Sequence, residues 1–120
     1  KSLIDKKILN SVHDVSSGGI LVALSEMCIG GKVGAKLKIK NQNISLLEYL
    51  FGEDQSRYLV EISEKNKDEV KKTLEKNSVY FEIIGKTQKD SLEINKDLNI
   101  KINELNKLNS SWFKQFFEEN

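Results

Sequence analysis

The first stretch that could do chemistry is Ser16-Ser17-Gly18-Gly19, which stands directly before the apolar run that begins at Ile20. If a helix starts here, the backbone N–H groups of the turn point outward at its N-terminus, where unpaired donors and a partial positive charge suit an anion. Gly18 and Gly19 lack side chains, so a phosphate could approach their backbone closely. The alternative is an ordinary helix cap whose glycines pack against a neighbouring strand, and a bare Ser-Ser-Gly-Gly pattern favours this cap.

The only histidine of the chain, His13, is followed by Asp14 just before this turn. Such a pair could orient a substrate or transfer a proton. A histidine beside the end of a strand more often hydrogen-bonds its neighbours, so we favour a structural role for His13 and assign no catalytic residue.

The second stretch is the polar turn at residues 52–57, which contains Glu53, Asp54, Gln55 and the only arginine, Arg57. In a chain so rich in lysine, one arginine indicates planar, bidentate pairing with a carboxylate or a phosphate. The alternative is an internal ion pair of Arg57 with Glu53 or Asp54 that fixes the turn, and the pattern leaves both open. The adjacent carboxylates could hold Mg²⁺, but two acidic residues do not specify a metal site, and we predict none.

Composition limits the class of protein that carries these stretches. The chain has 120 residues and a net charge of +1, which gives no reason to expect a nucleic-acid or membrane partner. The single cysteine, Cys28, excludes an internal disulfide and lies in an apolar helical pattern, so we expect a buried thiol and a cytoplasmic location. The sequence begins at Lys1 without an initiator methionine or a signal-peptide layout, so we expect a piece cut from a longer chain.

The elements that must position the two stretches alternate between helix and strand. The end of a helix is expected over residues 1–9 and a brief strand over 11–14. A helix is expected from Gly18 to about Ile29, capped by Ser16 or Ser17 and stopped by Gly30-Gly31. Alternation with lysines predicts a half-exposed strand over residues 35–39, and Ser45 caps a short helix that ends at Phe51.

The second half of the chain continues in the same way. The expected elements are a central strand at residues 57–63, an amphipathic helix at 65–76, a strand at 79–86, a hairpin around 95–99 and a helix at 105–119. We expect the last helix to use its aromatic cluster, Trp112, Phe113, Phe116 and Phe117, in core or interdomain packing. The pattern predicts an α/β (α+β) fold with a mixed β-sheet and packed helices, in a single domain that spans residues 1–120.

With both stretches in view, the chain resembles a known family. The segments HDVSSGGILVALSEM (residues 13–27) and LFGEDQSRYLV (residues 50–60) are similar to the C-terminal domain of phosphoribosylformylglycinamidine synthase. IGKT at residues 84–87 and the aromatic end WFKQFF support the resemblance, which runs over nearly the whole chain. Related enzymes share the Ser/Gly turn, but GEDQ with the following arginine points to this synthase.

The resemblance implies a fold like the C-terminal domain of aminoimidazole ribonucleotide synthetase, partly ferredoxin-like. It also implies an ATP-dependent ligase of purine biosynthesis, in which formylglycinamide ribonucleotide, ATP and glutamine-derived ammonia give formylglycinamidine ribonucleotide. The family's enzyme has two N-type and two C-type domains, and this chain resembles the last C-type domain. The implied partners are the remaining domains, a glutaminase subunit and a small accessory subunit.

The resemblance further implies roles for the residues of both stretches. Ser16, Gly18 and Gly19 are expected to contact a phosphate or nucleotide. A structural or ligand-side role is expected for the remaining site residues, which are His13, Asp14, Glu53, Gln55 and Arg57. ATP and Mg²⁺ are implied for the parent enzyme, but most of their ligands lie on the N-type domains, so we expect this piece to be inactive alone. Ser17 departs from the family's aspartate, which weakens any metal or substrate role there.

A different class of protein also fits the residues. The chain could be a stand-alone binding or regulatory module with a ferredoxin-like core that senses a phosphorylated small molecule. An open reading frame that continues upstream of Lys1 would favour the synthase over this module.

Overall fold

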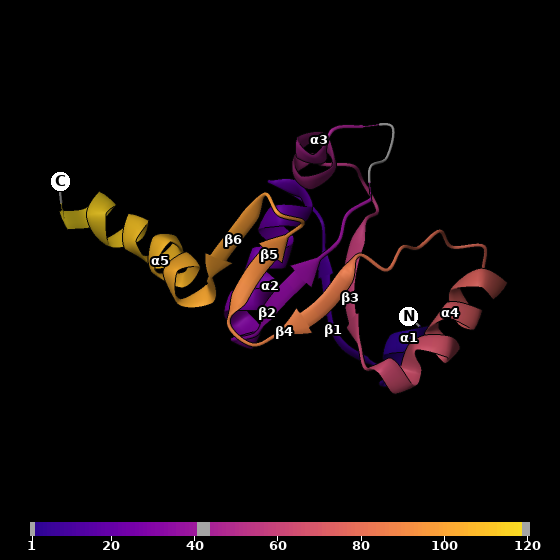
Figure 1. Cartoon of the computed structure of the whole chain (residues 1–120). Coiled ribbons are helices and arrows are strands. Elements are labelled where there is room, and N and C mark those ends of the chain that lie inside the picture. The colour runs from indigo at the N-terminus through magenta and orange to yellow at the C-terminus, as the bar shows by residue number, and fades with distance from the viewer. Residues whose placement is uncertain (1, 41–43, 119–120) are drawn as a thin grey trace.

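The computed structural model describes residues 2–40 and 44–118. In this part of the chain, helices and strands alternate along the sequence, as Figure 1 shows. The elements are α1 (Ser2–Asp5), β1 (Leu9–Asp14), α2 (Gly19–Gly31), β2 (Gly34–Leu37), α3 (Leu46–Phe51), β3 (Tyr58–Ile62), the 3₁₀ turn η1 (Glu64–Asn66), α4 (Lys67–Lys76), β4 (Gly85–Gln88), β5 (Ser91–Ile94), β6 (Leu98–Lys101) and α5 (Ile102–Glu118).

The strands form two sheets. The larger sheet has the order β4-β2-β5-β6, in which β2 and β5 run parallel and the other neighbours antiparallel. The smaller sheet is an antiparallel ribbon of β1 and β3, with Val12 opposite Val60. The predicted α/β fold with a mixed sheet and packed helices is therefore confirmed.

The hydrophobic core lies between α2 and the larger sheet. Leu92 and Ile94 of the inner strand β5 are 1% and 0% exposed, and Leu24 and Cys28 of α2 belong to the same buried cluster. Burial of apolar side chains against a sheet is the main term that stabilises such a layer. The prediction of a buried thiol is confirmed, and burial raises the pKa of Cys28.

Local sequence signals predict some helix boundaries well and others poorly. Ser45 caps α3 as predicted, because its hydroxyl accepts from the Glu48 N–H while the Glu48 carboxylate accepts from the Ser45 N–H. The predicted cap of α2 by Ser16 or Ser17 is wrong, because Gly18 is the N-cap residue, in the left-handed conformation, and no side chain caps it. The predicted stop at Gly30-Gly31 is close to the observed end, because α2 ends at Gly31 and Lys32 is its C-cap residue.

The predicted elements at residues 1–9, 35–39 and 57–63 agree with the structure to different degrees. The helix predicted over residues 1–9 ends at Asp5, and Leu9 already belongs to β1. Residues 35–37 are strand as predicted, and the expected alternation is confirmed, because Ala35 and Leu37 are buried and Lys36 is exposed. The predicted central strand at 57–63 is β3, which pairs with β1 in the two-stranded ribbon and is not central.

The strand predicted at residues 79–86 is also wrong. Residues 79–84 have no regular structure, and β4 begins only at Gly85. The pairing of β4 with β2 covers four residues, and beyond it one hydrogen bond joins the Lys38 N–H to the Ile84 carbonyl oxygen. Tyr80 and Ile83, which fall within the predicted strand, are 81% and 60% exposed.

The hairpin predicted around residues 95–99 is present as β5 and β6, and the last helix starts earlier than predicted, at Ile102. Figure 1 shows α5 leading away from the body of the molecule toward the C-terminus. Trp112, Phe116 and Phe117 are at least 60% exposed, so they are not part of the core of this chain. The Phe113 side chain lies outside the part that the structure describes.

Candidate functional site

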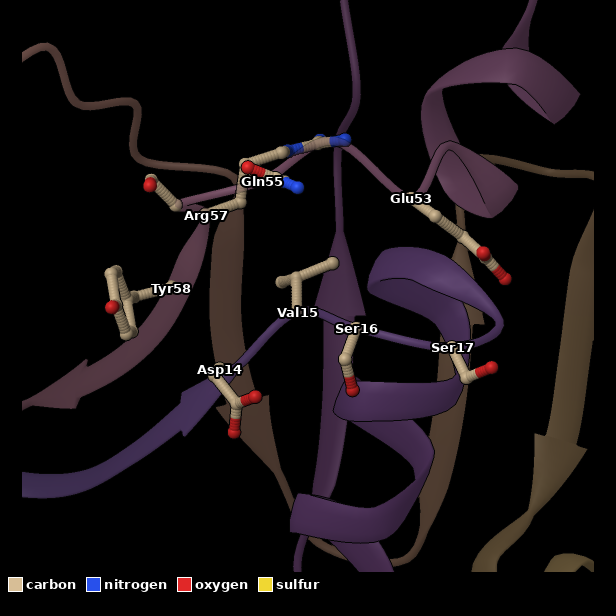
Figure 2. A pocket seen from close by; sticks show the side chains of 9 residues that line it. Asp14, Val15, Ser16, Ser17, Glu53, Gln55, Arg57 and Tyr58 are labelled. Atoms are coloured by element: carbon tan, nitrogen blue, oxygen red, sulfur yellow. The ribbon is translucent and has the colours of Figure 1, made fainter.

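The two stretches singled out by their chemistry lie side by side and line one pocket. Its volume is about 390 Å³, and it lies where β1 runs into the turn before α2 and where the turn after α3 runs into β3. Figure 2 shows the side chains around it. The lining residues are Asp14, Val15, Ser16, Ser17, Glu53, Gln55, Ser56, Arg57 and Tyr58.

A hydrogen bond between the two stretches joins them directly. The backbone N–H of Gly18 donates to Oε1 of Glu53 at 2.7 Å. The N–H of Gly19 donates to the carbonyl oxygen of Ser16 at 3.0 Å, which closes the turn. Two donors that the sequence offered to an external anion are therefore used inside the protein, and one of them already binds a carboxylate.

Gly18 and Gly19 begin α2 in a left-handed backbone, and Gly19 also lies where α2 closely approaches α3. Both have a positive φ, 81° for Gly18 and 69° for Gly19, and residues other than glycine rarely adopt such values. A Cβ on Gly19 would lie 2.6 Å from the carbonyl oxygen of Leu50 and 2.8 Å from the Cα of Phe51. The start of α2 thus packs on the backbone at the end of α3, which brings the following acidic turn to the Ser/Gly turn.

Arg57 forms one of the two internal pairs that the sequence left open. Its Nη1 lies 3.1 Å from Oδ2 of Asp54, and the same nitrogen donates to the Gly52 carbonyl oxygen at 3.4 Å. The guanidinium also lies over the Tyr49 ring, 5.4 Å from its centroid. Arg57 therefore holds the turn together through Asp54, which leaves Glu53 for Gly18.

Tyr49 extends this arrangement away from the pocket. Burial and, after it, the hydrogen bond to Glu82 at 3.1 Å together raise the pKa of the Tyr49 phenol to about 12. The hydroxyl therefore stays neutral at ordinary pH and donates its proton to Glu82.

The neighbouring residues His13 and Asp14 do not form a catalytic pair. The Nε2 of His13 lies 3.0 Å from Oε2 of Glu26 on α2, and its Nδ1 lies 2.6 Å from the carbonyl oxygen of Asp14. Both ring nitrogens thus have partners, one on α2 and one in the next residue of β1, which supports the structural role proposed from the sequence. The Asp14 carboxylate lines the pocket.

The charges around the pocket favour polar ligands over a simple anion. Asp14 and Glu53 contribute two carboxylates, and the one cation, Arg57, is paired with Asp54. Hydroxyls of Ser16 and Ser17 and the Gln55 amide lie between them (Figure 2). Among the described residues, no group of three or more His, Cys, Asp or Glu side chains could hold a metal ion.

Sequence reasoning overlooked two polar residues that line the pocket. Ser56 has a φ of 64° and turns the chain into β3, and Tyr58 is the first residue of that strand, with 66% of its side chain exposed. Strand alternation was the signal that could have found Tyr58, because it places residues 58 and 60 on the outer face. In the described part of the chain, no helix is long and apolar enough to cross a membrane.

Comparison with known proteins identifies relatives of this chain. The family described as "AIR synthase related protein, C-terminal domain" matches residues 1–96. The phosphoribosylformylglycinamidine synthase subunit PurL of Pelagibacter ubique is 47% identical over 116 residues, which cover 97% of this chain. The same subunit of Bartonella quintana is 34% identical over 119 residues, or 99% of this chain. The chain spans 16% of the length of each relative.

Solved structures show the same fold. The PurL of Thermotoga maritima complexed with ATP matches 87% of this chain with a TM-score of 0.73 and 18% identity, and the chain covers 20% of it. The PurLQS structure from Thermotoga maritima matches the same share of the chain with a TM-score of 0.74 and 17% identity. At these identities the likeness concerns the fold alone.

Proposed function

The chain belongs to the family of AIR synthase related protein C-terminal domains, and from this premise we propose that it is the last C-type domain of a phosphoribosylformylglycinamidine synthase subunit. The observation that carries the proposal is the 47% identity to the Pelagibacter ubique subunit over 97% of the chain. Both sequence stretches that line the pocket fall inside this match. The proposed enzyme is a ligase of purine biosynthesis that acts in the cytoplasm.

The proposed reaction joins ammonia to an amide carbon at the expense of ATP. Formylglycinamide ribonucleotide, ATP and ammonia give formylglycinamidine ribonucleotide, ADP and phosphate. ATP phosphorylates the amide oxygen, which activates the amide carbon. Ammonia then attacks this carbon, and the oxygen leaves with the phosphate as inorganic phosphate. A chain that spans 16% of its relatives holds one part of such a site, so we expect no turnover from these 120 residues alone.

The described residues do not by themselves fit ATP with Mg²⁺. They include no cluster that could hold a metal ion, and the Gly18 N–H is already bonded to Glu53. We therefore place the main ATP and Mg²⁺ ligands on other parts of the subunit. This chain would close one side of the site with the residues of its pocket.

We propose that Ser16, which lines that pocket, and the neighbouring Gly18 and Gly19 contact a phosphate or nucleotide in the assembled subunit. The exposed Ser16 and the half-buried Gly18 at the start of α2, a 13-residue helix whose dipole favours an anion, support this contact. Gly19 is buried and its N–H is bonded to Ser16, so it would contribute mainly by keeping the backbone free of a side chain. The hydrogen bond at 2.7 Å between Gly18 and Glu53 adds a condition, because the carboxylate must move aside before a phosphate can take its place. Asp14, Gln55 and Arg57 would shape the ligand side of the pocket.

The proposed partners are the other domains of the same subunit, a separate glutaminase that supplies ammonia and a small accessory subunit. The PurLQS structure from Thermotoga maritima, whose chain has the same fold, supports an assembly of this kind. The large apolar side chains that the described surface exposes, such as Tyr58 and Val60 of the ribbon, support burial against neighbouring domains.

A hybrid subunit tests the proposal. In it, this chain replaces the matching segment of the Pelagibacter ubique relative, and the hybrid is produced in a bacterium that lacks its own synthase subunit. We expect growth without added purine from the hybrid and none from a subunit with the segment deleted. A hybrid that accumulates as folded protein but does not support growth contradicts the proposal.

A further inference from the structure

Helix α5 carries one apolar stripe that is buried at its start and exposed along the rest. Ile102 is 7% exposed and Leu105 packs against the core cluster. Leu108, Trp112 and Phe116 continue at the three- and four-residue spacing of one helix face, and they are 61%, 60% and 60% exposed. Figure 1 shows this helix leading away from the two sheets. The face that seals the core therefore continues as an exposed surface.

The composition of the exposed part of α5 is typical of a protein interface. Residues 108–117 include one charged residue, Lys114, in a chain that is 31% charged. Depletion of charge and enrichment of Trp and Phe mark the centre of protein–protein contacts. Helical spacing places Asn103, Lys107 and Ser110 opposite the stripe, so the two faces of the helix differ clearly in polarity.

Helix α5 lies outside the segment that matches the family of AIR synthase related C-terminal domains. The family match ends at residue 96, before α5 begins at Ile102. The matches to the synthase subunits of Pelagibacter ubique and Bartonella quintana cover 97% and 99% of the chain and therefore include most of α5. The helix is thus shared with synthase subunits, whereas the core of the domain belongs to the wider family.

We propose that the exposed stripe of α5, Leu108, Trp112 and Phe116, docks into an apolar groove on the remaining part of the same synthase subunit. This inference rests on the proposed function, which supplies the occupant: the relatives extend far beyond the 16% of their length that this chain matches. The stripe is continuous with the contact that α5 already makes with the core, so docking would fix both ends of the helix. The opposite face, which includes Lys107 and Ser110, stays in solvent.

Hydrogen exchange of the hybrid subunit tests the docking. Amide exchange in peptides from residues 106–118 is compared between the hybrid and the isolated 120-residue chain. We expect exchange at least tenfold slower in the hybrid. The substitution Leu108→Lys in the hybrid should return it to the rate of the isolated chain. The matched control, Ser110→Lys, adds the same charge to the exposed opposite face and should keep the protection.

Each other outcome contradicts the docking. Equal exchange of α5 in the hybrid and the isolated chain overturns it, as does full protection in the Leu108→Lys hybrid. A dimer of the isolated chain that Leu108→Lys dissociates, measured by light scattering, assigns the stripe to a second copy and also overturns it. Enzyme activity separates the two proposals: an inactive hybrid with a protected α5 contradicts the function alone, and an active hybrid with an unprotected α5 contradicts the docking alone.

Discussion

At the residue scale, Glu53 determines what the Ser/Gly turn can bind. The sequence predicted that residues 16–19 and 53–57 carry the chemistry, and the structure places them around one pocket. The sequence could not predict which carboxylate binds which donor. Gly18 and Glu53 are 35 residues apart, and their contact depends on how α2 packs on α3. The pairing of Arg57 with Asp54, three residues away, is local and was one of the two alternatives that the sequence offered.

The substitution Glu53→Gln tests the exchange between this carboxylate and a bound phosphate. A neutral amide competes less for the Gly18 N–H and removes a negative charge beside the turn, so we expect the hybrid subunit to bind ADP about threefold more tightly. Calorimetric titration with ADP measures the change. Asp54→Asn is the matched control. Asp54 pairs with Arg57, whereas the Gly18 N–H donates to Glu53, so this substitution should leave the affinity for ADP unchanged. Weaker binding by the Glu53→Gln hybrid would show that Glu53 itself holds the ligand.

Arg57 is expected to matter more for stability than its acidic partner. The Asp54 side chain is 78% exposed, so we expect Asp54→Ala to change the free energy of unfolding by less than about 0.5 kcal/mol. Arg57→Lys loses the planar contact with Tyr49 and the bond to the Gly52 carbonyl oxygen, and should cost about 1 kcal/mol. Urea unfolding measures both. Equal effects of the two substitutions would mean that the ion pair alone fixes the turn.

At the element scale, the contact between the start of α2 and the end of α3 builds the site. Local signals were enough to predict both helices, since the Ser45 cap and the apolar spacing of residues 20–28 need no distant partner. Strand pairing is not local, and this is why the strand predicted at 79–86 and the central position of residues 57–63 were wrong. The packing of the two helices depends on Gly19, whose role in that contact no local pattern shows.

Alanine at two glycines of α2 tests this packing. Gly19→Ala places a Cβ 2.6 Å from the Leu50 carbonyl oxygen in a left-handed backbone, so we expect the free energy of unfolding to fall by about 2 kcal/mol or more. Gly30→Ala, where a Cβ meets nothing within 4 Å, should instead raise it by about 0.5 kcal/mol because alanine favours the helix. Urea unfolding compares them with the unchanged chain. Similar effects at both positions would argue against a close contact at Gly19.

The contact between α3 and the segment at residues 79–84 predicts a dependence on alkaline pH. The folded protein keeps the Tyr49 proton until about pH 12, whereas an unfolded tyrosine loses it near pH 10. The folded state thus binds more protons in this window, and its stability falls as pH rises from about 10 to about 12. Because Tyr49 is partly exposed, we expect a loss on the order of 1 kcal/mol. Tyr49→Phe should remove this loss when unfolding is measured at pH 9 and pH 11; an unchanged loss would contradict the role of Tyr49.

At the scale of the whole molecule, the surface of the chain fits the proposal that it is one part of a larger synthase subunit. Its core between α2 and the larger sheet is well buried, yet apolar side chains on the ribbon, on residues 79–84 and on α5 remain exposed. The sequence predicted the fold class and the family because the two motifs are specific, and the match to residues 1–96 confirms the family. From the sequence we expected the aromatic cluster of the last helix to take part in core or interdomain packing. The exposure of Trp112 excludes a place for it in the core of this chain.

The rate of formylglycinamidine ribonucleotide formation by the purified hybrid subunit tests the central claim most directly. Ammonium chloride replaces the glutaminase in this assay, so that only the synthase reaction is measured. The account predicts ATP-dependent formation of the amidine by the hybrid at a rate within about tenfold of the Pelagibacter ubique subunit, and none by the isolated chain. A folded hybrid without measurable turnover, or turnover by the isolated chain, would contradict it.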